Sequence, residues 1–233
     1  MTYTKRFDGR KFDQLRPIEA KVGVVKRANG SAMFKIGDTI AIAAVYGPRK
    51  LYPSFLQEQQ QAKLRCLYDM VSFSVTDRKR PGPSRRSTEI SMVTEQALLP
   101  ILDLSKYPGS VVDVFIYILQ ADAGTRCAGI CAASMALADA GIPMKDLVVA
   151  ISAGKIGGKI CLDLNKEEED HPEGATDIPI AILPREGKIS LLQLDGNIKR
   201  EELIEAINLV KKGSQEVYDI QKQALKQKYG GKK

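Results

Sequence analysis

One predicted helix of this sequence begins with residues suited to a bound anion. The stretch "ADAGTRCAGICAASMALADAGIP" (121–143) predicts a helix of small side chains that starts at Gly124, Thr125 and Arg126. A helix start exposes unpaired N–H groups and the positive end of the dipole, where Asp or Glu is the usual choice. An arginine there is unfavourable by about 0.3–1 kcal/mol unless an anion binds. We therefore favour a phosphate site over a solvated first-turn arginine.

A second predicted helix also begins with cations. Arg85 and Arg86 follow Ser84, which can cap that helix, and they end the basic run "DRKRPGPSRR" (77–86). They form either a charged helix surface or a pair of clamps for the phosphates of a nucleic acid. Aromatic residues make up 6% of the chain and tryptophan is absent, so backbone contacts should dominate over base stacking.

Carboxylates are concentrated in one stretch, "DLNKEEEDHPEGATD" (163–177). Asp177 leads directly into the predicted strand "IPIAIL", and Asp170 precedes it in the same stretch. Two such groups near a phosphate site can bind Mg²⁺ or act as a general acid. The glutamates at 167–169 are typical of a solvated run, and His171, the only histidine, is more often solvated than catalytic in such a loop.

The elements that must position these residues mix strands and helices. Apolar alternation and turn residues predict strands at 20–27, 64–75 and 110–120, and hairpins at 31–47, 147–164 and 178–194. Helical spacing predicts helices at about 84–99, 124–140 and 198–229, the last capped by Asn197. The stretch 55–63 is a loop or a short helix.

Composition limits the class of protein. The chain has 233 residues with a formal net charge of +7, which suits a polyanionic partner. It has no apolar run of membrane-spanning length, and its polar start lacks a signal-peptide core, so we expect a cytoplasmic protein without a membrane partner. The four cysteines lie in or beside apolar stretches without a CxxC pair, which favours buried free thiols over disulfides or zinc.

Several stretches together resemble the RNase PH family of phosphorolytic exoribonucleases. They are "RFDGRKFDQLRPI" (6–18), "GSAMFKIGDTIAIAAVYGP" (30–48), "PSRRSTEI" (83–90), "ILQADAGTRCAGICAASMALADAGIPM" (118–144) and "GATDIPIAILP" (174–184). They follow the family's order and span nearly the whole chain. The paired arginines and the "DAGIPMKDLV" and "DIPIAILP" segments are more similar to the catalytic subunits of archaeal exosomes than to bacterial RNase PH.

The resemblance implies an α+β RNase PH-type fold of two fused α/β halves with mixed sheets and packed helices. It implies a single RNase PH-type domain over 1–233, with approximate halves at 1–145 and 146–233, the second ending in a long helix.

The resemblance also implies residue roles. Gly124, Thr125 and Arg126 would hold inorganic phosphate, and Arg85 and Arg86 the RNA 3′ end. Asp177 would be the catalytic acid or a Mg²⁺ ligand. Asp170 is the nearest match to an upstream catalytic acid, although this chain has an extra residue between the two acids.

The implied activity is phosphate-dependent 3′-to-5′ degradation of single-stranded RNA, which releases nucleoside diphosphates and is reversible. The implied assembly is a hexameric ring with a related non-catalytic subunit and RNA-binding cap subunits. A bacterial-type enzyme that trims tRNA 3′ ends and a non-catalytic RNA-binding ring subunit are the alternatives. A hydrolytic nuclease would usually need a fuller set of metal-binding carboxylates, and an ordinary RNA-binding protein would not need the acidic cluster.

Overall fold

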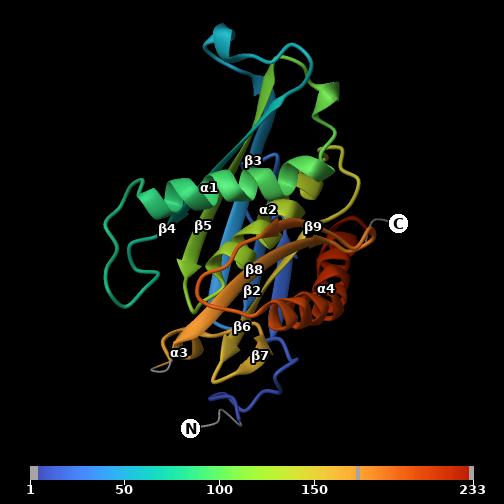
Figure 1. The fold of residues 1–233 in the computed structure, drawn as a ribbon. Helices are drawn as coiled ribbons and strands as arrows, with labels where there is room; N and C mark the ends of the chain where they lie inside the picture. The colour runs from blue at the N-terminus through green and yellow to red at the C-terminus, as the bar shows by residue number, and fades with distance from the viewer. Residues whose placement is uncertain (1–4, 172–173, 231–233) are drawn as a thin grey trace.

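The computed structural model describes residues 5–171 and 174–230, which form two sheets with helices packed on them (Figure 1). The first sheet has the order β1-β2-β3-β5-β4, and the second has the order β7-β6-β8-β9. The first contains β1 (Ile18–Val22), β2 (Gly30–Ile36), β3 (Thr39–Lys50), β4 (Lys63–Met70) and β5 (Ser110–Gln120). The second contains β6 (Val149–Ile156), β7 (Lys159–Leu162), β8 (Ala175–Leu183) and β9 (Lys188–Leu192). The expected α+β fold with mixed sheets is confirmed.

The three predicted helices are present. The described helices are α1 (Arg85–Leu98), α2 (Thr125–Asp139), α3 (Lys166–Glu169) and α4 (Arg200–Tyr229), with 3₁₀ turns η1 (Ser54–Leu56), η2 (Leu99–Ile101) and η3 (Leu104–Lys106). Ser84 caps α1 through the backbone N–H of Ser87, as expected. The prediction that Asn197 caps the last helix is wrong, because Lys199 is the N-cap and the Asn197 carbonyl accepts a hydrogen bond from Thr176.

Two strands are shorter than the sequence predicts, although the three predicted hairpins are present. β1 stops at Val22 because Gly23 adopts a left-handed conformation with φ 74°. β4 stops at Met70 because the chain then turns, with the Ser74 N–H bonded to the Val71 carbonyl. Apolar alternation alone does not reveal these stops.

Helix α2 lies between the two sheets and packs on β2 and β3 of the first and on β6 of the second. Small side chains make these close approaches possible. A Cβ atom at Gly129 would lie 3.2 Å from Cγ2 of Ile116, and one at Gly30 would lie 2.1 Å from the backbone nitrogen of Ala140. The small-residue composition of α2 therefore follows from burial on nearly all sides.

The pairing of β4 with β5 determines the positions of the two helix N-termini that carry cationic residues. These strands run parallel, and each leads into a helix, β4 into α1 and β5 into α2. Parallel neighbours end at the same edge of the sheet. Both helices therefore begin near that edge, although the loop before α1 (residues 71–84) is much longer than the one before α2 (residues 121–124).

The cysteine and membrane expectations can be compared with the described residues. The four cysteines are free and buried, as predicted, and burial raises the pKa of Cys131 and of Cys161 to about 12. In the described part of the chain, no helix has both the length and the apolar character needed to cross a membrane.

Candidate active site

A cavity of about 870 Å³ lies where the starts of α1 and α2 approach the end of α3 and strand β8. Most of the residues singled out from the sequence line it. Its chemically capable lining residues include Lys79, Arg86, Gly124, Thr125, Arg126, Lys166, Glu169, Asp170, Asp177 and Asp195. Arg85 is exposed and is not among the lining residues.

The start of α2 is open to an anion. Gly124 is its N-cap in the left-handed conformation, with φ 63°, and no side chain caps the helix. The first turn contains no acidic residue, and Thr125 is buried beside the cavity. The N–H groups of this turn and the helix dipole therefore have no negative side chain of their own helix to stabilise them.

Arg126 retains unused hydrogen-bonding capacity. Its Nη2 donates to Oε2 of Glu89 over 3.2 Å, whereas its buried Nε has no partner among the described residues. Glu89 also accepts a hydrogen bond from Nε2 of Gln193 over 2.8 Å, so it links α1 to the chain that follows β9. Sequence reasoning missed Glu89, whose only signal is its position one helical turn after Arg85.

Asp177 is a buried carboxyl on a rigid element. It lies in β8, where its backbone N–H and carbonyl pair with Asp195, both at 2.9 Å, and its Oδ1 accepts a hydrogen bond from Ser152. Burial raises the pKa of Asp177, although the Ser152 hydrogen bond and the charge of Arg126 act in the opposite direction. A carboxyl with a raised pKa can hold a proton for transfer. Sequence reasoning missed Ser152 and Asp195.

The carboxylates of the acidic stretch have different environments. Glu167 and Asp170 are exposed, and Asp170 pairs with Lys166 over 2.7 Å. Burial, followed by the charge of Asp177, raises the pKa of Glu169 to about 7. The expectation of a solvated run at 167–169 is therefore wrong for Glu168, which is fully buried, and for Glu169, which is partly buried at the cavity wall. Glu173 lies outside the described residues.

Glu168 forms a fully buried ion pair with Arg6. Its carboxylate accepts hydrogen bonds from Nε and Nη2 of Arg6 at 2.7 and 2.6 Å, and both side chains are fully buried. Arg6 also donates to the carbonyls of Leu162 and Asp163, both over 2.8 Å. These hydrogen bonds join the N-terminal segment to α3 and to the residues just before it.

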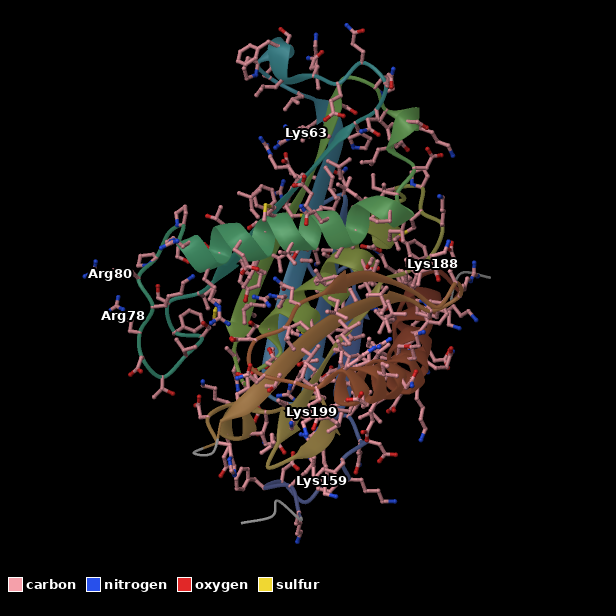
Figure 2. The ribbon with its side chains drawn as sticks, in the orientation of Figure 1. Lys63, Arg78, Arg80, Lys159, Lys188 and Lys199 are labelled. Carbon is pink, nitrogen blue, oxygen red and sulfur yellow. The ribbon has the colours of Figure 1, made fainter. Side chains whose placement is uncertain are left out.

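The basic loop at residues 71–84 adds positive charge beside the cavity. Figure 2 places Arg78 and Arg80 on the outer side of this loop, and both side chains are exposed. Lys79 is partly buried, lines the cavity and pairs with Asp69. Cations around a concave site attract polyanions over a distance.

The donor chemistry of the cavity fits a single Mg²⁺ ion. Among the described residues, no group of three or more His, Cys, Asp or Glu side chains is arranged to hold a metal. Mg²⁺, however, is commonly bound by one or two carboxylates, substrate phosphates and water. Asp177 and Glu169 line the same cavity, and each has a raised pKa that a nearby cation would lower.

The sequence matches two consecutive family models. Residues 14–143 match "3′ exoribonuclease family, domain 1", and residues 146–213 match domain 2 of the same family. That the halves 1–145 and 146–233 form one domain stays a prediction.

Curated relatives match over nearly the whole chain. Exosome complex component Rrp41 of Pyrococcus furiosus is 58% identical over 225 residues, which cover 97% of this chain and 89% of the relative. Exosome complex component Rrp41 of Methanopyrus kandleri is 52% identical over 226 residues, which cover 97% and 94% of the two chains.

Solved structures share the fold. Rice (Oryza sativa) Rrp46 matches with a TM-score of 0.84 and 26% identity, over 95% of this chain and all of that chain. A chain of the Archaeoglobus fulgidus exosome with RNA bound to the active site has a TM-score of 0.78 and 23% identity, over 92% of each chain, and supports the fold alone.

Proposed function

The chain belongs to the 3′ exoribonuclease (RNase PH) family, and from this premise we propose that its cavity is where inorganic phosphate shortens an RNA from its 3′ end. The chain is a phosphorolytic 3′-to-5′ exoribonuclease, similar to the Rrp41 component of archaeal exosomes. The roles of its individual residues are our proposal.

One observation supports these roles above the others: a helix start without acidic residues, an arginine of a second helix and a carboxyl with a raised pKa line one cavity. Phosphate would bind at Gly124, Thr125 and Arg126, where N–H groups, the helix dipole and a guanidinium act together. The charge of the bound phosphate would explain why an arginine stands in the first turn of α2.

The RNA 3′ end would reach the cavity along α1. Arg86 lines the cavity and would contact a backbone phosphate there, while Arg85 lies one residue earlier on the exposed surface. Arg78 and Arg80 would attract the strand over a longer range. These contacts carry little sequence preference, which suits the stepwise removal of successive nucleotides.

The proposed reaction exchanges one phosphorus–oxygen bond for another. An oxygen of phosphate attacks the last phosphodiester, the bond to the 3′ oxygen breaks, and the terminal nucleoside leaves as a diphosphate. Asp177 in its protonated form would donate a proton to the leaving 3′ oxygen. In the alternative role, an ionised Asp177 together with Glu169 would hold Mg²⁺, which would stabilise the charge on the phosphoryl oxygens. Because a phosphoanhydride replaces a phosphodiester, the reaction is reversible and can extend RNA.

The relatives support an assembly as well as an activity. We propose a hexameric ring in which this chain alternates with a related non-catalytic RNase PH-like subunit, because its relatives are exosome components. RNA-binding cap subunits on the ring and a cytoplasmic location belong to the same proposal. The presence of Arg126 and Asp177 at one cavity favours a catalytic subunit over a non-catalytic one.

The test follows the products. The full chain, alone and with a candidate ring partner, is incubated with an unstructured, uniformly labelled RNA and Mg²⁺, with and without inorganic phosphate. Nucleoside diphosphates should form only with phosphate, and excess diphosphate should extend the RNA. Monophosphate products in phosphate-free buffer would contradict the proposal and indicate hydrolysis.

A further inference from the structure

A buried arginine of the N-terminal segment contacts the loop that precedes α2. The Arg16 side chain is 5% exposed, and its Nη1 donates to the backbone carbonyl of Asp122 and, over 3.1 Å, to Oδ2 of the same residue. Its Nη2 lies 3.3 Å from where a Cβ atom of Gly124 would be. This guanidinium therefore contacts the loop that presents the phosphate site.

A single carboxylate orients the arginine. Asp163 accepts hydrogen bonds from Nε and Nη2 of Arg16 at 2.9 and 2.7 Å, and from the Arg16 backbone N–H at 2.9 Å. Asp163 is 2% exposed and follows β7, shortly before α3. Such a bidentate pair between buried groups fixes the plane of the guanidinium.

The loop needs this support because its backbone is strained. Ala123 has φ 58°, a left-handed conformation that side chains with a Cβ disfavour, and Gly124 follows with φ 63°. Thr39, at the start of β3, donates to the Ala123 carbonyl over 2.7 Å and accepts from the Asp122 N–H over 2.9 Å. Asp163, with φ 55°, is the other non-glycine residue with positive φ in the described chain.

We infer that Arg16, oriented by Asp163, is a positioning residue for phosphate: it holds Asp122–Gly124 in the conformation that directs the first turn of α2 into the cavity. This inference rests on the proposed function. Oδ1 of Asp122 also accepts from the Lys166 N–H over 3.1 Å, so the same loop is joined to the start of α3. Arg86 on α1 has no part in this network, so RNA binding should be independent of it.

The test separates phosphate binding from RNA binding in the full chain, assembled with the partner that gives wild-type activity. Asp163→Asn should raise KM for phosphate by about tenfold or more, because a charged hydrogen-bond network is lost. RNA affinity without phosphate should stay within about twofold of wild type. Arg16→Lys, which keeps the charge, should have a smaller effect than Arg16→Met.

A matched control lies at the other end of the same helix. Asp139 is also buried, and it accepts hydrogen bonds from Lys228 and from the Tyr229 hydroxyl. Asp139→Asn should lower the melting temperature while leaving KM for phosphate unchanged. A purely structural role for Asp163 would make the two variants behave alike.

The outcomes are distinct. A folded Asp163→Asn variant with wild-type KM for phosphate would overturn the inference, as would equal losses of RNA affinity and phosphate affinity. If Asp163→Asn fails to fold, Asp122→Ala decides, because its side chain is 30% exposed and its removal breaks the side-chain contacts to Arg16 and Lys166. Wild-type cleavage that ignores phosphate would contradict the proposed function itself.

Discussion

The start of α2 and the acidic segment at residues 163–171 line the same cavity but are built differently. α2 is a helix of 15 residues packed between two sheets, whereas α3 has four residues and is held mainly by charged groups. In α2 the useful residues are adjacent in sequence. In the acidic segment, each carboxylate depends on distant partners, such as Arg6, which lies 162 positions from Glu168. The first kind of site can be recognised in a sequence, and the second needs the fold.

Asp177, on β8 beside the acidic segment, is the carboxyl that we propose carries the chemistry on this side of the cavity. Asp177→Asn should reduce turnover by at least about 100-fold, because it keeps the shape but removes the carboxyl that either donates the proton or binds Mg²⁺. RNA affinity should be unchanged or higher, because a negative charge near the backbone is lost. Turnover and RNA binding are measured on the same assembled preparation.

Asp170→Asn is the companion variant, since Asp170 is exposed and paired with Lys166. An equal loss of turnover would mean that Asp170 shares the chemistry. Near-normal turnover of Asp177→Asn would move the catalytic acid elsewhere.

Glu169 should make the free energy of unfolding depend on pH. Its folded pKa is about 7 against a usual value of 4.5, mainly through burial and the charge of Asp177. Because the folded state binds this proton more tightly than the unfolded state, the proton contributes to the free energy of unfolding. This contribution is fully present below pH 4.5 and is lost as pH rises through 7. Glu169→Gln should therefore stabilise the protein at pH 8 by about 1–2 kcal/mol, after allowance for partial exposure, and by almost nothing at pH 4.

Thermal unfolding at both pH values tests this prediction. Glu167→Gln, in an exposed glutamate of the same helix, should change stability by less than about 0.5 kcal/mol at either pH. Identical pH profiles for the two variants would show that Glu169 is solvated after all.

The smallest predicted effect distinguishes two neighbouring arginines on the basic side. Loss of a phosphate contact should flatten the slope of log affinity against log salt by about 0.7 for a single strand. Arg86→Ala should show this change fully, because Arg86 lines the cavity, and Arg85→Ala should show less. RNA binding is titrated over a salt series without phosphate. Equal slopes for the two variants would mean that the cavity does not define the RNA path.

What could be predicted from the sequence also differs between residues that are adjacent in the chain and residues that meet only in the fold. Periodicity and turn residues located nearly all long elements, and cap chemistry located the start of α1. The expectation of solvated glutamates holds for Glu167 and is wrong for Glu168 and Glu169, because identical side chains in one short run differ only through tertiary contacts. Ser152 and Asp195 carry no local pattern and Glu89 only its spacing from Arg85, so the packed structure is needed to show that they contact Asp177 and Arg126.

The burial of α2 also limits how the enzyme can respond to its substrate. A helix in contact with both sheets, with backbone approaches too close for a single extra methyl group at Gly30, cannot shift without disturbing the whole core. We expect the phosphate site to be a fixed surface in free and bound states. Any induced fit must then come from the basic loop at 71–84, which carries exposed side chains and can rearrange at lower energetic cost.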